Sequence, residues 1–245
     1  MQIAAIGFDA DDTLWHNEDH FNATEEAFAD IVAPWATPDE ARALLLTTET
    51  HNLELFGYGV KSFTLSMIEA AMELSGGAIG TADLSVLLDR GKAMLARPAE
   101  LLPNVREVVE SLSERHPLLL ITKGDLHHQE RKVQLSGIAH HFAAVEVVSE
   151  KDTTSYARIL QRHSIDATRF VMIGNSVKSD VLPTVALGAV GIHIPYTFTW
   201  AHEVVDSHHV EQAERNIEGA RYWELEAIGE VPALIRRLQA RPEVC

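Results

Sequence analysis

Cysteine is almost absent from the sequence, which has a single one, Cys245. An internal disulfide is therefore impossible, which excludes the small disulfide-stapled folds and fits a reducing cytoplasm. Long apolar runs are also absent, since none approaches the roughly 18 residues that a membrane-spanning helix needs. The first apolar stretch ends at Asp9 and has no basic region before it, so we expect no signal peptide. These absences predict a cytoplasmic protein that does not bind a membrane.

Basic residues are scarce as well. Lys and Arg number 20 against 36 Asp and Glu, which gives a formal net charge of −16. Such a charge argues against nucleic acid and against an anionic membrane surface as partners. It does not exclude a phosphorylated substrate, because a bound metal and one or two lysines can reverse the field locally. With 46% hydrophobic residues, the chain has enough apolar material for one sizeable domain, or for a domain with an insert.

The stretch IAAIGFDADDTL, residues 3–14, organises the rest of the chain. Its apolar run from Ile3 to Phe8 has strand length and no charge, which predicts a buried parallel strand. Asp9 and Asp11 follow where that strand leaves the sheet, at the edge where open α/β sheets bind ligands. In extended backbone they would face the same side, roughly 6.6 Å apart, and two like charges so close favour a cation such as Mg²⁺ between them. A solvated acidic turn or a helix N-cap is the alternative for this motif on its own.

A helical insert is predicted for residues 16–97. Apolar residues recur there at helical spacing in four segments separated by Pro and Gly, over residues 24–32, 39–55, 61–74 and 82–95. The second segment has a clear start, with Thr37 as N-cap and Glu40 three positions on. The sequence therefore predicts about four packed helices that leave the sheet after the first strand and return before Leu101.

From Pro98 onward, strand and helix patterns alternate. Strands are expected at residues 118–121, 143–148, 170–173 and 190–194, and helices at residues 104–115, 126–136, 153–163, 179–187 and 231–239. Such alternation predicts an α/β fold with a Rossmann-like, doubly wound parallel sheet. We expect a core domain of residues 1–15 and 98–245 and an inserted α-helical domain of residues 16–97. Residues 200–230 are rich in His and Glu and give no clear pattern.

Polar residues follow the later strands just as they follow the first one. They are Thr122 and Lys123, then Ser149, Glu150 and Lys151, and then Asn175, Ser176 and Asp180. Acidic oxygens at this edge can hold Mg²⁺, while a hydroxyl, an ammonium and free loop amides can hold phosphate oxygens. Simpler roles stay open for single residues: Thr122 can cap the next helix, Lys151 can be solvated, and Asp180 can interact with a helix dipole.

Taken together, the motifs FDADDTL (residues 8–14), LLLITKG (residues 118–124), Lys151 and IGNSVKSD (residues 173–180) resemble those of the haloacid dehalogenase-like (HAD) hydrolase superfamily. Most members of that superfamily are phosphatases, and the helical insert looks like its C1-type cap domain. The resemblance covers nearly the whole chain. It implies an Mg²⁺-dependent phosphomonoester hydrolase that acts on a small phosphorylated metabolite, such as a sugar phosphate, a nucleotide or a flavin phosphate, through an aspartyl-phosphate intermediate.

The resemblance also implies a role for each site residue. Asp9 would be the nucleophile, and Asp11 would protonate the leaving oxygen and then activate water. Thr122 and Lys151 would bind the phosphoryl group, Lys151 tying it to the nucleophile, and Lys123–Gly124 at the strand end suits an anion. The Mg²⁺ ligands would be Asp9, the backbone carbonyl of Asp11 and the fourth motif, through Asn175 or Asp180.

Two alternatives remain at this stage. Many family members have Asp where this chain has Asn175, so a binding or regulatory protein with weak catalysis stays open. A dehalogenase-type hydrolase is the other alternative, but dehalogenating members lack the second aspartate, because a halide leaving group needs no proton. Asp11 therefore favours a phosphatase, and Asp12 is expected to be a structural hydrogen-bonding residue. The sequence does not decide between a monomer and a homodimer.

Overall fold

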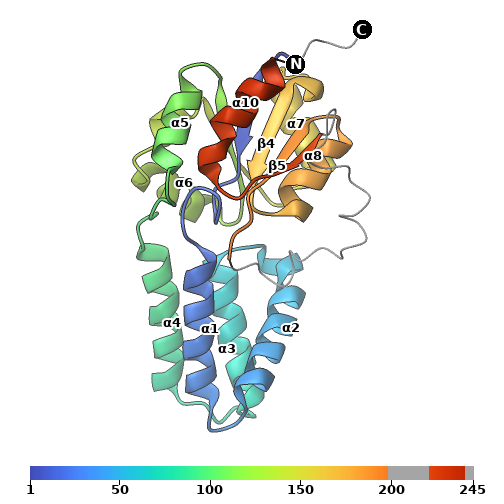
Figure 1. Ribbon diagram of the computed structural model, residues 1–245. Coiled ribbons are helices and arrows are strands. Elements are labelled where there is room, and N and C mark those ends of the chain that lie inside the picture. The colour runs from blue at the N-terminus through green and yellow to red at the C-terminus, as the bar shows by residue number, and fades with distance from the viewer. Residues whose placement is uncertain (198–220, 241–245) are drawn as a thin grey trace. The chain divides into compact units, whose positions relative to one another are not determined.

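The computed structural model describes residues 1–197 and 221–240, so Cys245 and residues 200–220 of the poorly patterned stretch 200–230 lie outside it (Figure 1). The described chain forms two compact units. One contains Met1–His16, Ala99–Lys123 and the described residues from Arg131 onward. The other contains Asn17–Pro98 together with the short segment Gly124–Glu130. None of the described helices is long and apolar enough to cross a membrane.

The first unit is built on a six-stranded sheet in the order β3-β2-β1-β4-β5-β6. All neighbouring strands are parallel, and the strands are β1 (Ala5–Phe8), β2 (Leu118–Lys123), β3 (Ala144–Val148), β4 (Phe170–Gly174), β5 (Val190–His193) and β6 (Tyr222–Glu224). The chain enters at the centre, adds β2 and β3 on one side of β1, and then adds β4 to β6 on the other. The predicted doubly wound parallel sheet is therefore confirmed, with its switch point between β1 and β4.

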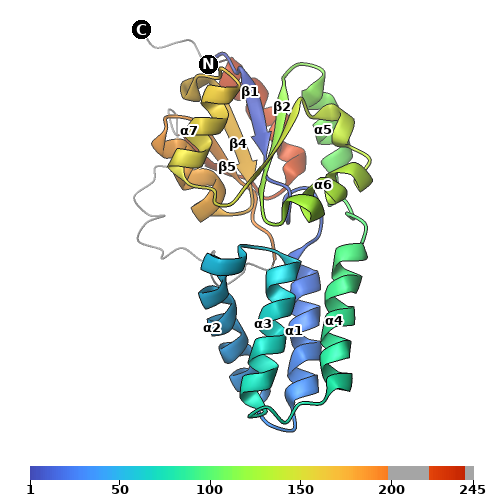
Figure 2. The same cartoon turned by 180° about the vertical axis from the view of Figure 1, so that it is seen from behind.

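Helices cover both faces of this sheet (Figure 2). On one face lie α5 (Val105–Ser113), α10 (Val231–Gln239) and the second half of α6 (Leu126–Leu135). On the other lie α7 (Thr153–Arg162) and the short α8 (Leu182–Ala186). The central strands supply alternate residues to the two layers: Ile6, Phe8, Leu118, Leu120, Val171 and Ile173 to the first, and Ala5, Leu119, Ile121, Phe170 and Met172 to the second. This alternation is why the strands are apolar throughout.

Three expectations at the sheet need correction. The first strand begins at Ala5 instead of Ile3 and ends at Phe8, and Asp11 lies beyond it in an isolated β-bridge with Trp15, followed by Asp12 at φ +62°. The predicted helix over residues 179–187 is instead a π-helical turn, Val177–Val181, followed by α8. Strand β6 was missed, because three residues are too few for alternation to be visible.

The second unit contains the helices α1 (Glu18–Val32), α2 (Pro38–Phe56), α3 (Val60–Leu74) and α4 (Thr81–Ala96). Their shared core includes Phe28, Leu45, Phe63, Met67 and Leu87, all at most 2% exposed. The predicted capping box at Thr37 and Glu40 is confirmed, with both reciprocal bonds present. Helix α1 begins at Glu18 instead of residue 24, because its first turn is polar and shows no apolar periodicity.

One carboxyl group in the four-helix unit is buried without an ion pair or a hydrogen bond among the described residues. Glu49 of α2 is only 8% exposed. Burial, together with the smaller effects of the nearby carboxylates of Glu25 and Glu18, raises the pKa of Glu49 from 4.5 to about 8. The side chain is therefore neutral in the folded protein at pH 7 and ionised in the unfolded chain.

Glu49→Gln should stabilise the protein, since glutamine keeps the shape and cannot ionise. The folded-state pKa lies above the unfolded value, so the cost of Glu49 is absent below about pH 4.5 and grows as the pH rises toward 8. We expect a gain of about 3 kcal/mol in the free energy of unfolding at pH 7 and almost none at pH 4. Urea unfolding at both pH values measures this gain, and Glu73→Gln, at an exposed position, is the control. An equal change at both pH values would contradict this account.

Candidate active site

Side chains from four strand ends meet at the carboxyl edge of the sheet in the first unit. Asp9 follows β1, and its backbone N–H donates to the carbonyl of Ile173 in β4 at 2.8 Å, which fixes the exit of β1 against its neighbour. Lys151 follows β3, and Asn175 follows β4. The structure therefore brings together residues that lie more than 160 positions apart in the sequence, as the parallel sheet predicts.

Lys151 lies at the centre of this cluster. Its ammonium donates to Asp9 Oδ1 and to Asp180 Oδ1, the latter at 2.8 Å, and all three side chains are at most 8% exposed. Burial alone would lower the pKa of Lys151, but the two carboxylates and their hydrogen bonds raise it instead. Lys151 is therefore a fixed positive charge beside Asp9.

Both oxygens of the Asp9 carboxylate have a donor. Lys151 occupies Oδ1, and the hydroxyl of Thr13 donates to Oδ2 at 2.8 Å. Burial raises the pKa of Asp9 to about 6, the ammonium of Lys151 opposes that rise, and the charge of Asp180 adds to it. At neutral pH Asp9 is therefore still mainly a carboxylate, held in one orientation, which is the state that a nucleophile requires.

Thr13 also connects Asp9 to Asn175. The Thr13 hydroxyl accepts from the backbone N–H of Asn175 at 3.0 Å and lies 3.3 Å from Asn175 Oδ1. One hydroxyl thus lies between a carboxylate oxygen and an amide oxygen. Among the described residues no three His, Cys, Asp or Glu side chains gather as a metal site, so a cation here would need the amide oxygen, backbone carbonyls or water as further ligands. Such oxygen ligands suit Mg²⁺.

Asp180 is engaged on both oxygens. Its Oδ1 accepts from Lys151 and lies 3.4 Å from the hydroxyl of the buried Tyr156, and its Oδ2 accepts from the N–H of Ser176 at 3.0 Å. At 1% exposure it is enclosed by these donors. Its contacts identify Asp180 as the residue that anchors Lys151 and closes the loop after β4.

This packing leaves no room for a side chain at Gly174. A Cβ there would lie 2.1 Å from Asp180 Oδ2 and 2.7 Å from its Cβ. Gly174→Ala should therefore displace Asp180 and loosen Lys151, with a loss of about 2 kcal/mol in the free energy of unfolding. Urea unfolding measures the loss, and Gly80→Ala is a control because the nearest atom to its Cβ would lie at 3.6 Å. Equal stability of the two variants would contradict the tight fit at Gly174.

Asp11 has partners that the sequence did not reveal. The ammonium of Lys132 donates to both of its oxygens, at 2.6 and 2.8 Å, and the indole Nε1 of Trp15 donates to Oδ1 at 2.6 Å. Neither Lys132 nor Tyr156 was predicted as a site residue, since each occupies a helical position that reads as surface or core. Asp12 donates its backbone N–H to the carbonyl of Trp15, which closes the turn around Asp11.

The end of β2 supplies the remaining predicted residues. Thr122 is 1% exposed, and the hydrogen bond of its hydroxyl within the described residues is a long one, 3.5 Å to the carbonyl of Lys123. Lys123 donates to the hydroxyl of Ser179 at 3.2 Å and lies 3.7 Å from Glu150. Gly124 has φ +126°, a conformation that favours glycine, and groups with the four-helix unit.

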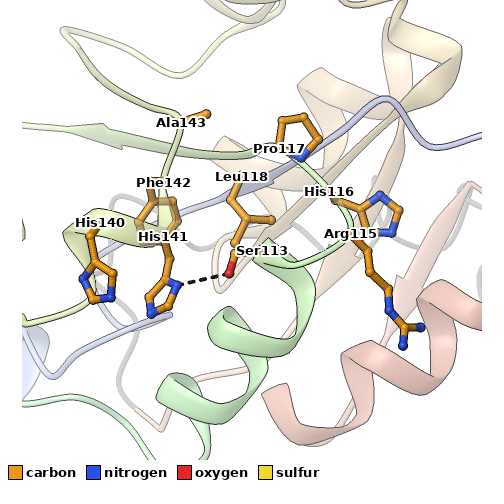
Figure 3. A pocket seen from close by; sticks show the side chains of 9 residues that line it. All are labelled: Ser113, Arg115, His116, Pro117, Leu118, His140, His141, Phe142 and Ala143. Atoms are coloured by element: carbon orange, nitrogen blue, oxygen red, sulfur yellow. Dashed lines mark hydrogen bonds between the residues drawn. The ribbon is translucent and has the colours of Figure 1, made fainter.

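A separate hollow of about 420 Å³ lies at the opposite, amino edge of the sheet, where β2 begins and where the chain enters β3 (Figure 3). It is lined by Ser113, Arg115, His116, Pro117, Leu118, His140, His141, Phe142 and Ala143. Ser113 Oγ lies 3.1 Å from His141 Nδ1, and burial lowers the pKa of His116, with the charge of Arg115 adding to the effect. None of the predicted site residues lies there, so the hollow is not part of the candidate active site.

The comparisons with known proteins agree with this geometry. The family model of the haloacid dehalogenase-like hydrolases matches residues 3–188. The crystal structure of a haloacid dehalogenase-like family hydrolase from Xanthomonas campestris is 40% identical and has a TM-score of 0.84, covering 97% of this chain and 92% of that one. This chain belongs to the haloacid dehalogenase-like hydrolases.

More distant HAD structures share the fold of this HAD hydrolase. YfnB of Bacillus subtilis, solved with bound magnesium, is 16% identical with a TM-score of 0.62, covering 96% of this chain and 99% of that one. The L-2-haloacid dehalogenase of Xanthobacter autotrophicus is 17% identical with the same TM-score and the same coverage. At such identities the likeness concerns the fold alone. No curated protein matches this HAD hydrolase significantly.

Proposed function

We propose that this HAD hydrolase is an Mg²⁺-dependent phosphomonoester hydrolase that acts on a small phosphorylated metabolite. The observation that carries the proposal is the second carboxylate, Asp11, held in place beside the buried Asp9–Lys151 pair. A halide leaves without a proton, whereas an alcohol or sugar oxygen needs one. A second carboxylate held in place can therefore protonate the leaving group in ester hydrolysis, a step that dehalogenation does not need.

In the proposed reaction, a carboxylate oxygen of Asp9 attacks phosphorus and the bond from phosphorus to the ester oxygen breaks. Asp11, which must enter this step in its protonated form, gives its proton to that oxygen as the alcohol leaves. Asp11 then takes a proton from water, which attacks the aspartyl-phosphate, releases phosphate and restores Asp9. Lys151 and Thr122 offset charge on the phosphoryl oxygens, which is the main demand of phosphoryl transfer.

The donor set fits one Mg²⁺ with water completing its shell. We propose that Asp9, Asn175 and the backbone carbonyl of Asp11 hold the ion, because the hydroxyl of Thr13 contacts both Asp9 Oδ2 and Asn175 Oδ1, whereas Asp180 holds Lys151 and the N–H of Ser176. When bound, Mg²⁺ would reduce the repulsion between the Asp9 carboxylate and the phosphate dianion. Asn175 supplies an oxygen without a charge, so the affinity for the ion should be lower than with a second carboxylate.

We further propose that residues 16–97 serve as the cap domain and residues 1–15 and 98–245 as the core. A cap domain selects substrates by enclosing them and excludes water during the reaction. This role favours a small soluble ester over a phosphoprotein. Turnover of phosphopeptides above that of every small phosphate ester tested would contradict it.

The test compares two chemistries on the purified protein. Phosphate release from p-nitrophenyl phosphate and from a panel of sugar and nucleotide phosphates is measured with Mg²⁺ and with EDTA, and chloride release from 2-chloropropionate is measured in parallel. Metal-dependent phosphate release without chloride release would support the proposal. Chloride release would identify a dehalogenase. Release of neither product would favour a binding protein with little turnover.

A further inference from the structure

Lys132 is an ammonium group buried at the candidate active site without a role in the chemistry proposed so far. It lies in the second half of α6 and is 7% exposed. Lysine is rarely so buried unless an opposite charge is present, because the desolvation of an ammonium is costly. Its charge partner is Asp11, which it contacts through both carboxylate oxygens at 2.6 and 2.8 Å.

Trp15 provides a second fixed donor to the same carboxylate. Its side chain is fully buried, and its indole Nε1 lies 2.6 Å from Asp11 Oδ1. Its backbone pairs with residues on both sides, since a β-bridge joins it to Leu101 and its carbonyl accepts from the N–H of Asp12. The indole therefore cannot move without disturbing the turn from Asp11 to Trp15.

Asp11 needs such support because of its place in the chain. Strand β1 ends at Phe8, and Asp11 lies beyond it, where its backbone forms an isolated bridge with Trp15 just before a turn with Asp12 at positive φ. Outside the sheet no neighbouring strand packs against its side chain, and Asp11 is 22% exposed. A bidentate ammonium and an indole N–H from different elements, α6 and the end of the turn, together leave one orientation for its carboxylate.

We propose that Lys132 is a positioning residue that, with Trp15, holds the Asp11 carboxylate in its place for proton transfer. The inference rests on the proposed function, in which Asp11 protonates the leaving oxygen. A proton donor displaced by an ångström loses much of its effect, and general acid catalysis contributes roughly 100- to 10,000-fold. Protonation by a general acid is needed when the leaving group is an alkoxide. It is nearly unnecessary for nitrophenolate, which leaves readily as the anion.

The kinetic experiment uses Lys132→Met with one alkyl and one nitrophenyl phosphate. We expect kcat for the alkyl ester to fall at least about 30-fold and kcat for the nitrophenyl ester to fall less than about threefold. In an Asp11→Asn background, Lys132→Met should cause little further loss of kcat, because both changes remove the same interaction, the one between Lys132 and Asp11. Lys92→Met, at an exposed pair with Asp89, is the control and should leave both rates unchanged.

Equal losses on the two esters would mean that Lys132 is merely structural, and additive losses in the double variant would mean that it does not act through Asp11. Either result would overturn the inference. Lys132→Arg, which keeps the charge and several donors, should recover part of the alkyl-ester rate. Wild-type protein that hydrolyses neither ester would count against the proposed function instead.

A second readout does not depend on turnover. The chain has four tryptophans, and Trp15→Phe identifies the indole N–H signal of Trp15 in a ¹H–¹⁵N spectrum. In Lys132→Met that signal should move upfield and exchange faster with water, because the Asp11 carboxylate leaves its position and the indole loses its acceptor. An unchanged Trp15 signal, as expected in Lys92→Met, would show that Asp11 stays in place without Lys132 and would overturn the inference.

Discussion

Asp9→Asn should abolish phosphate release, with kcat reduced by a factor of at least about a thousand. An amide oxygen is a far weaker nucleophile than a carboxylate, and no other described carboxylate occupies its place after β1. The fold should persist, because Asn has the same shape and Lys151 keeps Asp180 as its partner at 2.8 Å. Phosphate binding should be largely retained, since Thr122 and Lys151 are unchanged. Activity is measured as kcat on p-nitrophenyl phosphate. Phosphate affinity is measured as inhibition of the wild type by inorganic phosphate and as direct binding of inorganic phosphate to the variant.

Asp12→Asn is the matched control for that variant. Asp12 is also buried and lies three positions on, but its φ of +62° places it in the left-handed region, which Asn adopts readily. We expect its kcat to stay within about threefold of the wild type, because we assign it no chemical step. Residual activity above a tenth of wild type in Asp9→Asn, or an equal loss in both variants, would contradict the assignment of Asp9 as the nucleophile.

The sequence predicted the fold well, because the sheet is buried on both faces. A parallel strand covered twice must be apolar throughout, and such runs are visible in a sequence, as at Leu118–Lys123 and Phe170–Gly174. The polar residue that ends each run was equally visible. Those two signals located Asp9, Thr122, Lys151 and Asn175 at one edge, and the structure places them there.

What the sequence could not show were partnerships across long separations. Lys132 sits in a polar helix whose charged residues all resemble surface residues, and nothing local marks it as the one that turns inward to Asp11. Tyr156 reads as core packing, and only the tertiary fold brings its hydroxyl near Asp180.

The choice between Asn175 and Asp180 as metal ligand also depended on tertiary contacts. The sequence left the choice between them open. In the structure the two oxygens of Asp180 accept from Lys151 and Ser176, whereas Asn175 shares the hydroxyl of Thr13 with Asp9. Our proposal that Asn175 holds the ion therefore rests on its contact with the hydroxyl that also binds Asp9, a property that no sequence pattern contains.

Lys151→Met should be the most destabilising single change at this site. It would leave the carboxylates of Asp9 and Asp180 buried side by side, at 8% and 1% side-chain exposure, without their shared countercharge. Removing one member of a buried ion pair costs about 3–5 kcal/mol in the free energy of unfolding. For a chain of this size that corresponds to a fall of roughly 10 °C in Tm. Loss of the exposed Lys92–Asp89 pair in Lys92→Met should lower the free energy of unfolding by less than about 1 kcal/mol.

The pH dependence of Lys151→Met separates lost charge from lost packing. Burial raises the folded-state pKa of Asp9, and without the ammonium of Lys151 nothing from that side chain opposes the rise. The penalty is then absent below the unfolded pKa of Asp9 near 4 and grows as the pH rises. We expect a large loss at pH 8, a small one at pH 4, and partial recovery at pH 8 in Lys151→Met/Asp180→Asn, which removes one of the two charges. Urea unfolding of both variants at both pH values measures this. A loss that is equal at the two pH values would mean that Lys151 stabilises the fold by packing, and its role as the fixed positive charge beside Asp9 would have to be abandoned.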